Sequence, residues 1–322
     1  MFELAAANLL SPIILSFALG LIAALARSDL SIPEAVAKGM SIYLLFSIGF
    51  KGGVAVADNG IDAQLVGTLA AGFILSGIIP FVAFGLLRVL TKLDTLNAAA
   101  VAGHYGSISI VTFVASSSVL ESAGLAAEGY MVATAAIMEA PAILSALWLA
   151  SHASGESRMD AGLLREIMLN GSIVLLVGSF FIGLLTGNDG LDLISSFIVA
   201  PFQGVLCLFL LDMGLIAGRG LRETKGALGG GTILFGVLMP FVGASFGLGS
   251  GLLLGLSTGG IVLLMTLSAS ASYIAVPAAM RVALPEAKPA IYLTLSLGVT
   301  FPFNLVLGIP LYLAVATMIT GG

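Results

Sequence analysis

The sequence predicts an all-α membrane protein of ten transmembrane helices, built as two inverted five-helix repeats. Its composition gives the first reason: mean hydropathy is +1.14, and 59% of the residues are hydrophobic. Only 9% are charged, against about 25% in a typical soluble domain. The second reason is the alternation of basic and cation-free connections along the chain. The third is a resemblance between the two halves.

Ten apolar segments have the length of about 20 residues that a membrane-spanning helix requires. The first set lies at about 8–26, 36–57, 64–88, 95–119 and 129–151, and the second at about 168–187, 193–218, 228–247, 251–280 and 289–319. We therefore expect one five-helix repeat in residues 1–152, a polar cytoplasmic linker in 153–167 and a second, inverted repeat in 168–322. No basic residue precedes Arg27, so the first segment is expected to remain as a helix rather than to be a cleaved signal.

Basic residues occur in every second connection between these segments. The connections that carry them hold Arg27 and Lys38, Arg88 and Lys92, Arg158 and Arg165, Arg219, Arg222 and Lys225, and finally Arg281 and Lys288. The intervening connections have no Lys or Arg, so every cation except Lys51 is expected on one face. The positive-inside rule makes that face cytoplasmic. We expect a multi-pass protein of the bacterial inner membrane with both termini outside.

The two halves repeat several local patterns at an offset of about 160 residues. The matched segments are Pro80-Phe81-Val82 with Pro240-Phe241-Val242, Leu45, Gly49 and Gly53 with Leu210, Gly214 and Gly218, and Pro141 with Pro302. An odd number of spans in each half forces the second half to enter from the opposite side. Inverted repeats with a binding site near the middle of the membrane are typical of secondary transporters.

Small polar residues interrupt the fourth and ninth segments, at residues 102–112 and 266–277. Paired interruptions at corresponding positions of two repeats indicate a transport site. Backbone N–H groups at the start of a half-helix favour an anion, and freed carbonyls supply oxygen ligands for sodium. The alternative is that Ser and Gly only allow the helices to pack closely.

Five polar residues within the segments have open roles. Glu139 precedes a proline, and can coordinate a cation, take up a proton, pair with Lys51 or anchor the bundle. For Lys51 and Asp212, a structural pair between the repeats or snorkelling toward an interface is preferred to substrate binding. His104 is a pH sensor, a substrate donor or a hydrogen-bonded structural residue. Asn304 contributes its amide to the site or packs.

The sequence argues against the enzyme classes. It has no His-Glu-x-x-His or Gly-x-Ser-x-Gly motif, and no phosphate-binding Gly-x-x-x-x-Gly-Lys. A single cysteine, Cys207, excludes an internal disulfide, and a net charge of −5 gives no indication of nucleic-acid binding. No cofactor is expected, and sodium or protons remain as the power source for transport.

The Gly103-His-Tyr-Gly106 motif, the Ser107, Ser109 and Thr112 cluster, Glu139-Ala-Pro141 and the Ser268–Pro277 block resemble the sodium-dependent bicarbonate transporter family, best known from cyanobacteria. The resemblance extends over essentially the whole chain. It implies a homotrimer, with spans one, two, six and seven as a gate domain and the others as a core domain. It also implies bicarbonate between the broken fourth and ninth helices, sodium nearby, and a small PII-type protein as a regulatory partner.

The resemblance assigns residues to the site by position. Those expected to bind substrate are Gly106, Ser107, Ser109, Ala269, Ser270 and Ser272. Those expected to bind the cation are Thr112, Glu139, Ser268 and Asn304, with His104 and Tyr273 as further candidates. Cyanobacterial members have Asp at the position of Tyr273, and Tyr cannot offer sodium a carboxylate, so this departure bears on both substrate and ion number.

The predicted function is therefore sodium-coupled symport of a small anion, bicarbonate first, by alternating access of the core domain against the gate domain. Transport of another small carboxylate, or proton coupling through Glu139, is the alternative within transport. A membrane sensor or scaffold with the same fold but no coupled flux is the alternative from a different class.

Overall fold

The computed structural model describes residues 10–60, 62–154, 171–223, 229–273 and 284–321, with isolated positions at 165, 169, 276, 277 and 280. The described part is helical and contains no strand. Eight of its helical segments are long and apolar enough to cross a membrane, and two shorter apolar helices, Pro12–Leu25 and Thr258–Ala269, accompany them. The chain is a multi-pass membrane protein.

The helices follow one another with short connections. In the first half they are α2 (Pro12–Leu25), α3 (Glu34–Asn59), α4 (Ala63–Leu90), α5 (Thr95–Gly106), α6 (Ile110–Ser122), α7 (Met131–Ile137) and α8 (Glu139–Ser154). In the second half they are α10 (Gly171–Ile198), α11 (Phe202–Glu223), α12 (Gly230–Leu253), α13 (Thr258–Ala269), α15 (Pro289–Leu295), α16 (Phe301–Phe303) and α17 (Ile309–Thr320). Two π-helical turns, η1 (Ser296–Thr300) and η2 (Asn304–Gly308), interrupt the last segment.

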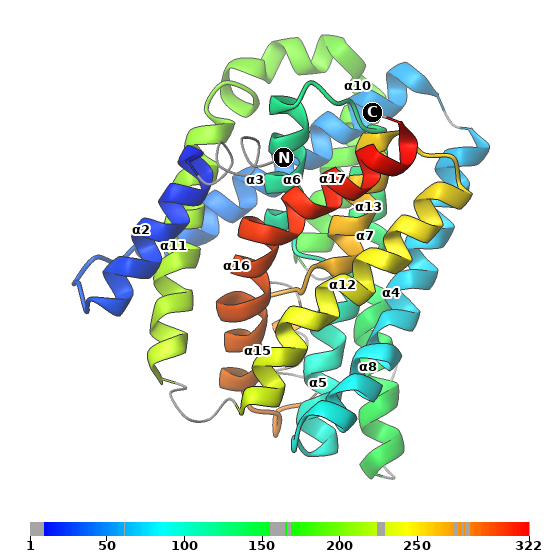
Figure 1. Cartoon of the computed structure of the whole chain (residues 1–322). Coiled ribbons are helices and arrows are strands. Elements are labelled where there is room, and N and C mark those ends of the chain that lie inside the picture. The colour runs from blue at the N-terminus through cyan, green and yellow to red at the C-terminus, as the bar shows by residue number, and fades with distance from the viewer. Residues whose placement is uncertain are drawn as a thin grey trace.

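The helices fall into two groups. In the first, α3 packs along α10 and α2 packs along α11, and these are the most extensive helix pairs of the fold (Figure 1). In the second, α4 packs on α5 and α8, and α12 packs on α13 and α4. The broken pairs α5–α6 and α13–α15 thus lie within the second group, beside the first.

Glycines allow the first group to pack closely. A side chain at Gly53 would collide with the Phe180 carbonyl oxygen of α10. A side chain at Gly214 would meet the Phe17 carbonyl oxygen of α2 in the same way. The second span of each half therefore packs, through matching glycines, on the first span of the other half.

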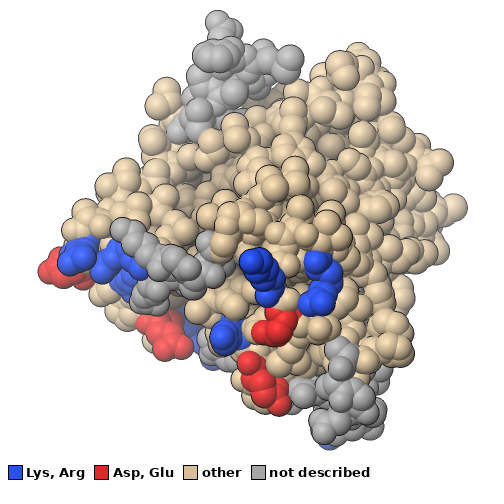
Figure 2. Space-filling view, turned by 60° about the horizontal axis from the view of Figure 1, so that its bottom comes forward, with Lys and Arg blue, Asp and Glu red and all other residues tan. Residues whose placement is uncertain are grey.

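Basic side chains gather at one end of the bundle, which Figure 2 brings forward. Arg88 lies in the last turn of α4, Arg222 in the last turn of α11, and Lys288 directly precedes α15. All three helix ends point to the bottom of Figure 1, whereas both ends of the described chain lie in its upper half. The predicted clustering is confirmed for these residues, and Lys225, Arg158 and Arg281 lie outside the described residues.

A hydrogen-bonded connection ties the two halves at this basic end. Asp94 caps α5 by accepting from the Asn97 backbone N–H at 2.8 Å, and the Asn97 side chain accepts from the Lys288 backbone N–H at 2.8 Å. Burial raises the pKa of the Asp94 carboxyl, but hydrogen bonds from Asn97 and the charge of Lys288 outweigh it, so the pKa lies below its ordinary value. The start of α5 is thereby fixed to the start of α15.

The boundary between the sixth and seventh segments differs from the prediction. The sequence predicts a connection at 188–192 and the next span from 193, but α10 continues to Ile198 and α11 begins at Phe202. Gly187, with φ of 57°, turns the chain without ending the helix. Residues 188–198 therefore form a separate helical arm across the top of the bundle (Figure 1). The predicted linker at 153–167 lies almost entirely outside the described residues.

Candidate functional site

Two helices break at the centre of the bundle, and the breaks face each other. The first break runs from Ser107 to Ser109, whose backbones are extended, with φ and ψ of −87° and 164° at Ser107. The second begins at Ser270, with φ and ψ of −83° and 163°. Glycine and serine favour such breaks, because glycine disfavours a helix and a serine side chain can cap a new one. Ser109 caps α6 by accepting from the Thr112 backbone N–H at 3.2 Å.

Direct hydrogen bonds join the two breaks. The Ser109 backbone N–H donates to Ser270 Oγ at 2.9 Å, and Ser270 Oγ donates to the Leu267 carbonyl at 2.9 Å. The Ser272 backbone N–H donates to the His104 carbonyl at 2.7 Å. Ser107, Ser109, Ser270 and Ser272 are all almost fully buried at this crossing. The structure thus brings the four serines together, as the sequence predicts.

The crossing has hydrogen-bonding groups that nothing in the described chain satisfies. Ser107 Oγ, Ser268 Oγ, His104 Nε2 and the Tyr273 hydroxyl are all buried without a hydrogen-bond partner. The Tyr273 hydroxyl lies near Ser109 but forms no aligned hydrogen bond. A buried polar group without a partner costs about 1–3 kcal/mol, so four at one place favour a polar ligand or water there.

The crossing presents both signs of partial charge. The start of α6 directs backbone N–H groups toward it, which carry positive partial charge. The ends of α5 and α13 direct backbone carbonyls toward the same region, which carry negative partial charge. An anion and a cation can therefore be held side by side without a charged side chain at the breaks themselves.

Gly106 allows the first break to approach α4. A side chain at Gly106 would collide with the Pro80 ring and come within 2.7 Å of the Ser76 carbonyl oxygen. In the second half, a side chain at Gly243 of α12 would collide with the Ser268 carbonyl oxygen. Each break therefore rests on the third helix of its own half, close to the matching prolines.

The last segment supports the second break. Asn304 donates through Nδ2 to the Ala269 carbonyl at 3.0 Å and accepts from the Tyr312 hydroxyl at 2.8 Å. Asn304 begins the π-helical turn η2, and Thr300 ends η1. Thr300 bonds to Tyr105 of α5 and donates to the Gly236 carbonyl at 2.8 Å. π-helical turns often mark functional sites.

The remaining predicted site residues lie at two distances from the breaks. Thr112 donates through its hydroxyl to Ser109 Oγ at 2.8 Å, so it belongs to the crossing. Glu139 begins α8 directly after a helix break at Met138. It is 4% exposed, and its Oε2 has no hydrogen-bond partner among the described residues. The structure connects the start of α8 to α4 through Ser76, which bonds to the Met138 carbonyl and to the Ala142 N–H.

His104 is held in place from two sides. Its Nδ1 lies 2.6 Å from the Ala100 carbonyl, and its ring stacks on Tyr292 at 4.4 Å between centroids. The stacking and the helical hydrogen bond account for Nδ1 but leave Nε2 for another group. His104 therefore remains a candidate for the site, although it stands one turn before the break.

Lys51 and Asp212 do not form the structural pair that the sequence suggests. Lys51 Nζ lies 4.2 Å from the centroid of the Phe202 ring, and the charged group acting on it is Glu121. Asp212 is instead acted on by Arg219. Nearby positions in matching spans suggest a pair, but in the fold the two side chains face different neighbours.

Sequence reasoning missed Thr300, Tyr105 and the π-helical turns. The prolines of the last segment, Pro302 and Pro310, were the signal that its helix is irregular. They do not reveal that the irregularity takes the form of widened turns, because this depends on the packing of α12 and α13 against the segment.

Apolar membrane helices around two interrupted ones, with a polar crossing and unpaired hydrogen-bonding groups, define a transporter rather than an enzyme. The profile of the Na⁺-dependent bicarbonate transporter superfamily matches residues 12–317. The chain belongs to that family. No individual curated protein matches it in sequence.

Proposed function

We propose that this protein is a sodium-coupled symporter of a small anion, bicarbonate first. The observation that carries the proposal is the contact between Ser109 and Ser270 across two broken helices, with unpaired polar groups beside it. A planar anion accepts hydrogen bonds from backbone N–H groups and serine hydroxyls. Family membership supports both the anion and sodium.

The proposed architecture is the inverted repeat of residues 1–152 and 168–322, joined by a cytoplasmic linker at 153–167. Helices α2, α3, α10 and α11 form the gate domain, and the remaining helices form the core domain. The reciprocal packing of α3 on α10 and of α11 on α2 supports this division. The basic end of the bundle is the cytoplasmic side, so both termini lie outside, in the inner membrane of a bacterium.

Alternating access follows from this division. The substrate site lies wholly in the core domain, because both breaks belong to it. A sliding movement of the core along the gate would expose the crossing first on one side of the membrane and then on the other. The gate domain can stay rigid during this movement, because its glycines hold its helices together.

Sodium is proposed to lie beside the anion, held by oxygen atoms of Thr112, Ser268 and Asn304. Ser268 Oγ is buried and unpaired, and the Asn304 side chain already orients the Ala269 carbonyl. Tyr273, where cyanobacterial members have Asp, offers a hydroxyl in place of a charged ligand. A cation held without that carboxylate requires the negative charge of the co-transported anion, which couples the two.

Uptake by reconstituted protein tests the proposal. Purified protein in liposomes is expected to accumulate labelled bicarbonate under an inward sodium gradient, and to accumulate none when potassium replaces sodium. Accumulation that ignores sodium would contradict the coupling. Liposomes that take up no small anion at all would favour the sensor or scaffold role.

Glu139→Gln separates the roles of the buried carboxyl. If Glu139 contributes to coupling, the variant remains folded but loses the dependence of uptake on sodium or on a proton gradient. Proton coupling is kept as a second candidate because Oε2 is buried and unpaired. A variant with a lowered melting temperature and unchanged ion dependence would show instead that Glu139 anchors the bundle.

Two partners are proposed on the family resemblance alone. The first is the protein itself, as a homotrimer, and the second is a PII-type regulator on the cytoplasmic face. Size-exclusion chromatography with light scattering in detergent tests the trimer directly.

A further inference from the structure

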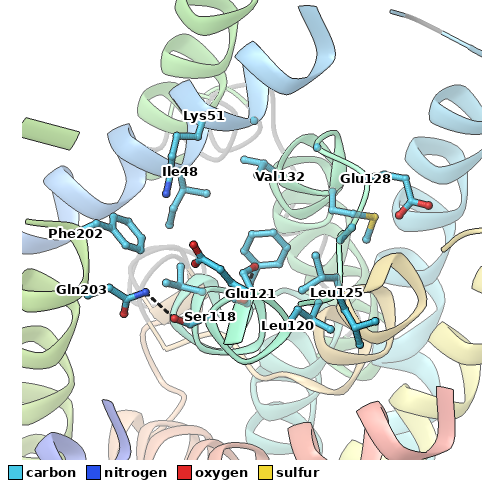
Figure 3. A pocket seen from close by; sticks show the side chains of 18 residues that line it. Ile48, Lys51, Ser118, Leu120, Glu121, Leu125, Glu128, Val132, Phe202 and Gln203 are labelled. Atoms are coloured by element: carbon cyan, nitrogen blue, oxygen red, sulfur yellow. Dashed lines mark hydrogen bonds between the residues drawn. The ribbon is translucent and has the colours of Figure 1, made fainter. Parts of the chain in front are cut away.

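A second cavity lies away from the crossing, between the two groups of helices. It has a volume of about 370 Å³ and is lined by α3, α6, α7, the beginning of α11 and α13. Figure 3 shows it from close by. The connection between α6 and α7 forms one of its walls, and this connection lies at the top of Figure 1, opposite the basic end. None of the serines of the crossing lines it.

The size and wall of the cavity fit an organic molecule. Small-molecule sites have volumes of about 300–1,000 Å³ and are mostly apolar with a few polar groups. Here the apolar wall includes Ile48, Phe113, Leu120, Leu125 and Met131. An inorganic anion would leave most of this wall in contact with water, whereas an apolar side chain would cover it.

Two opposite charges point into the cavity from its two sides. Lys51 extends from α3 of the gate, and Glu121 extends from α6 of the core (Figure 3). Lys51 Nζ also lies over the Phe202 ring at 4.2 Å, an arrangement that favours a cation without neutralising it. Glu128, the other acid of the lining, is already engaged, because it accepts from the Ser257 backbone N–H at 2.7 Å and from the Ser257 hydroxyl at 3.1 Å.

A ligand that matches this wall must carry both charges. A carboxylate without an ammonium would pair with Lys51 but bring its charge close to Glu121. An amine without a carboxylate would be repelled by Lys51. We propose that the cavity binds a small zwitterion with an apolar side chain, of the α-amino acid class, with its carboxylate toward Lys51 and its ammonium toward Glu121.

The bound zwitterion would bridge the gate and the core, because Lys51 and Glu121 belong to different groups of helices. It would hold the two groups in the arrangement seen here, and so slow any movement between them. The inference does not rest on the proposed anion transport, since the cavity shares no residue with the crossing.

Equilibrium binding of labelled L-leucine to the purified full-length protein in detergent tests the proposal. We expect saturable binding that weakens at least tenfold in Glu121→Gln and in Lys51→Met. Glu121 is exposed, so its substitution should not unfold the protein. Lys38→Met is the matched control, because Lys38 is an exposed lysine of the same helix as Lys51 and lies outside the cavity. This variant should bind leucine normally.

Two leucine analogues separate the charges. 4-Methylpentanoate lacks the ammonium, 3-methylbutylamine lacks the carboxylate, and each should compete at least tenfold more weakly than leucine. The Ser270→Leu variant should bind leucine normally, which distinguishes this cavity from the crossing. Absent leucine binding, unchanged binding by Glu121→Gln, or equal competition by 4-methylpentanoate would each overturn the proposal.

Discussion

Replacing Ser270 by leucine is expected to abolish anion uptake while the protein still folds. Ser270 Oγ accepts from the Ser109 N–H and the residue is 1% exposed, so leucine removes the acceptor and fills the space of the proposed ligand. The Ser109 N–H loses its partner, which costs about 1–3 kcal/mol of stability. Uptake into liposomes, with size-exclusion chromatography to confirm folding, measures both effects.

The matched control for this variant is Ser245→Leu. Ser245 lies on the exposed side of α12 and donates only to the Phe241 carbonyl of its own helix. The same change of size and polarity should leave uptake intact there. Ser109→Leu is expected to fail as Ser270→Leu does, with a further loss of about 1 kcal/mol from the lost helix cap. Full uptake by both serine variants would rule out the crossing as the substrate site.

Gly53→Ala is expected to have the largest effect on stability. An added methyl group at Gly53 would collide with the Phe180 carbonyl oxygen and approach the Leu184 backbone nitrogen to 2.6 Å. Backbone atoms of a packed helix cannot move aside as a flexible side chain can, so α3 and α10 must separate. Overpacking typically costs about 1–3 kcal/mol, and a clear decrease of the melting temperature in detergent should report it.

Gly39→Ala provides the matched control in the same helix. Nothing lies within 4 Å of a side chain built at Gly39, and alanine is favoured over glycine in a helix by about 1 kcal/mol. The variant should be as stable as the parent protein or slightly more so. Equal melting temperatures for Gly53→Ala and Gly39→Ala would contradict the close packing of the gate helices.

The positions of the helices could largely be predicted from the sequence, because membrane-spanning segments must be long and apolar. The helix beyond Gly187 could not, since a positive φ at one glycine redirects a helix without any polar residue having to end it. The polar stretch at 188–192 resembles a loop, but its backbone groups are satisfied within the helical arm.

The crossing could be predicted as a set of residues but not as a geometry. Small polar residues in matching segments indicate where the helices break. They do not indicate that the Ser109 N–H donates to Ser270, because this bond joins residues 161 positions apart. The outer cavity escapes prediction for a similar reason. The repeat relates Lys51 to Asp212, whereas its charged neighbour, Glu121, lies at the exposed end of α6 and has no counterpart in the pattern.

The central claim is that the buried crossing of the two broken helices binds the anion and becomes accessible to water during transport. Thiol labelling tests it most directly, because Cys207 is the single cysteine and can be replaced by serine. In that background, Ser107→Cys should react with a membrane-impermeant thiosulfonate, and bicarbonate with sodium should slow the reaction. A cysteine at position 107 that never reacts from either side, or that reacts at a rate unaffected by bicarbonate and sodium, would contradict the account.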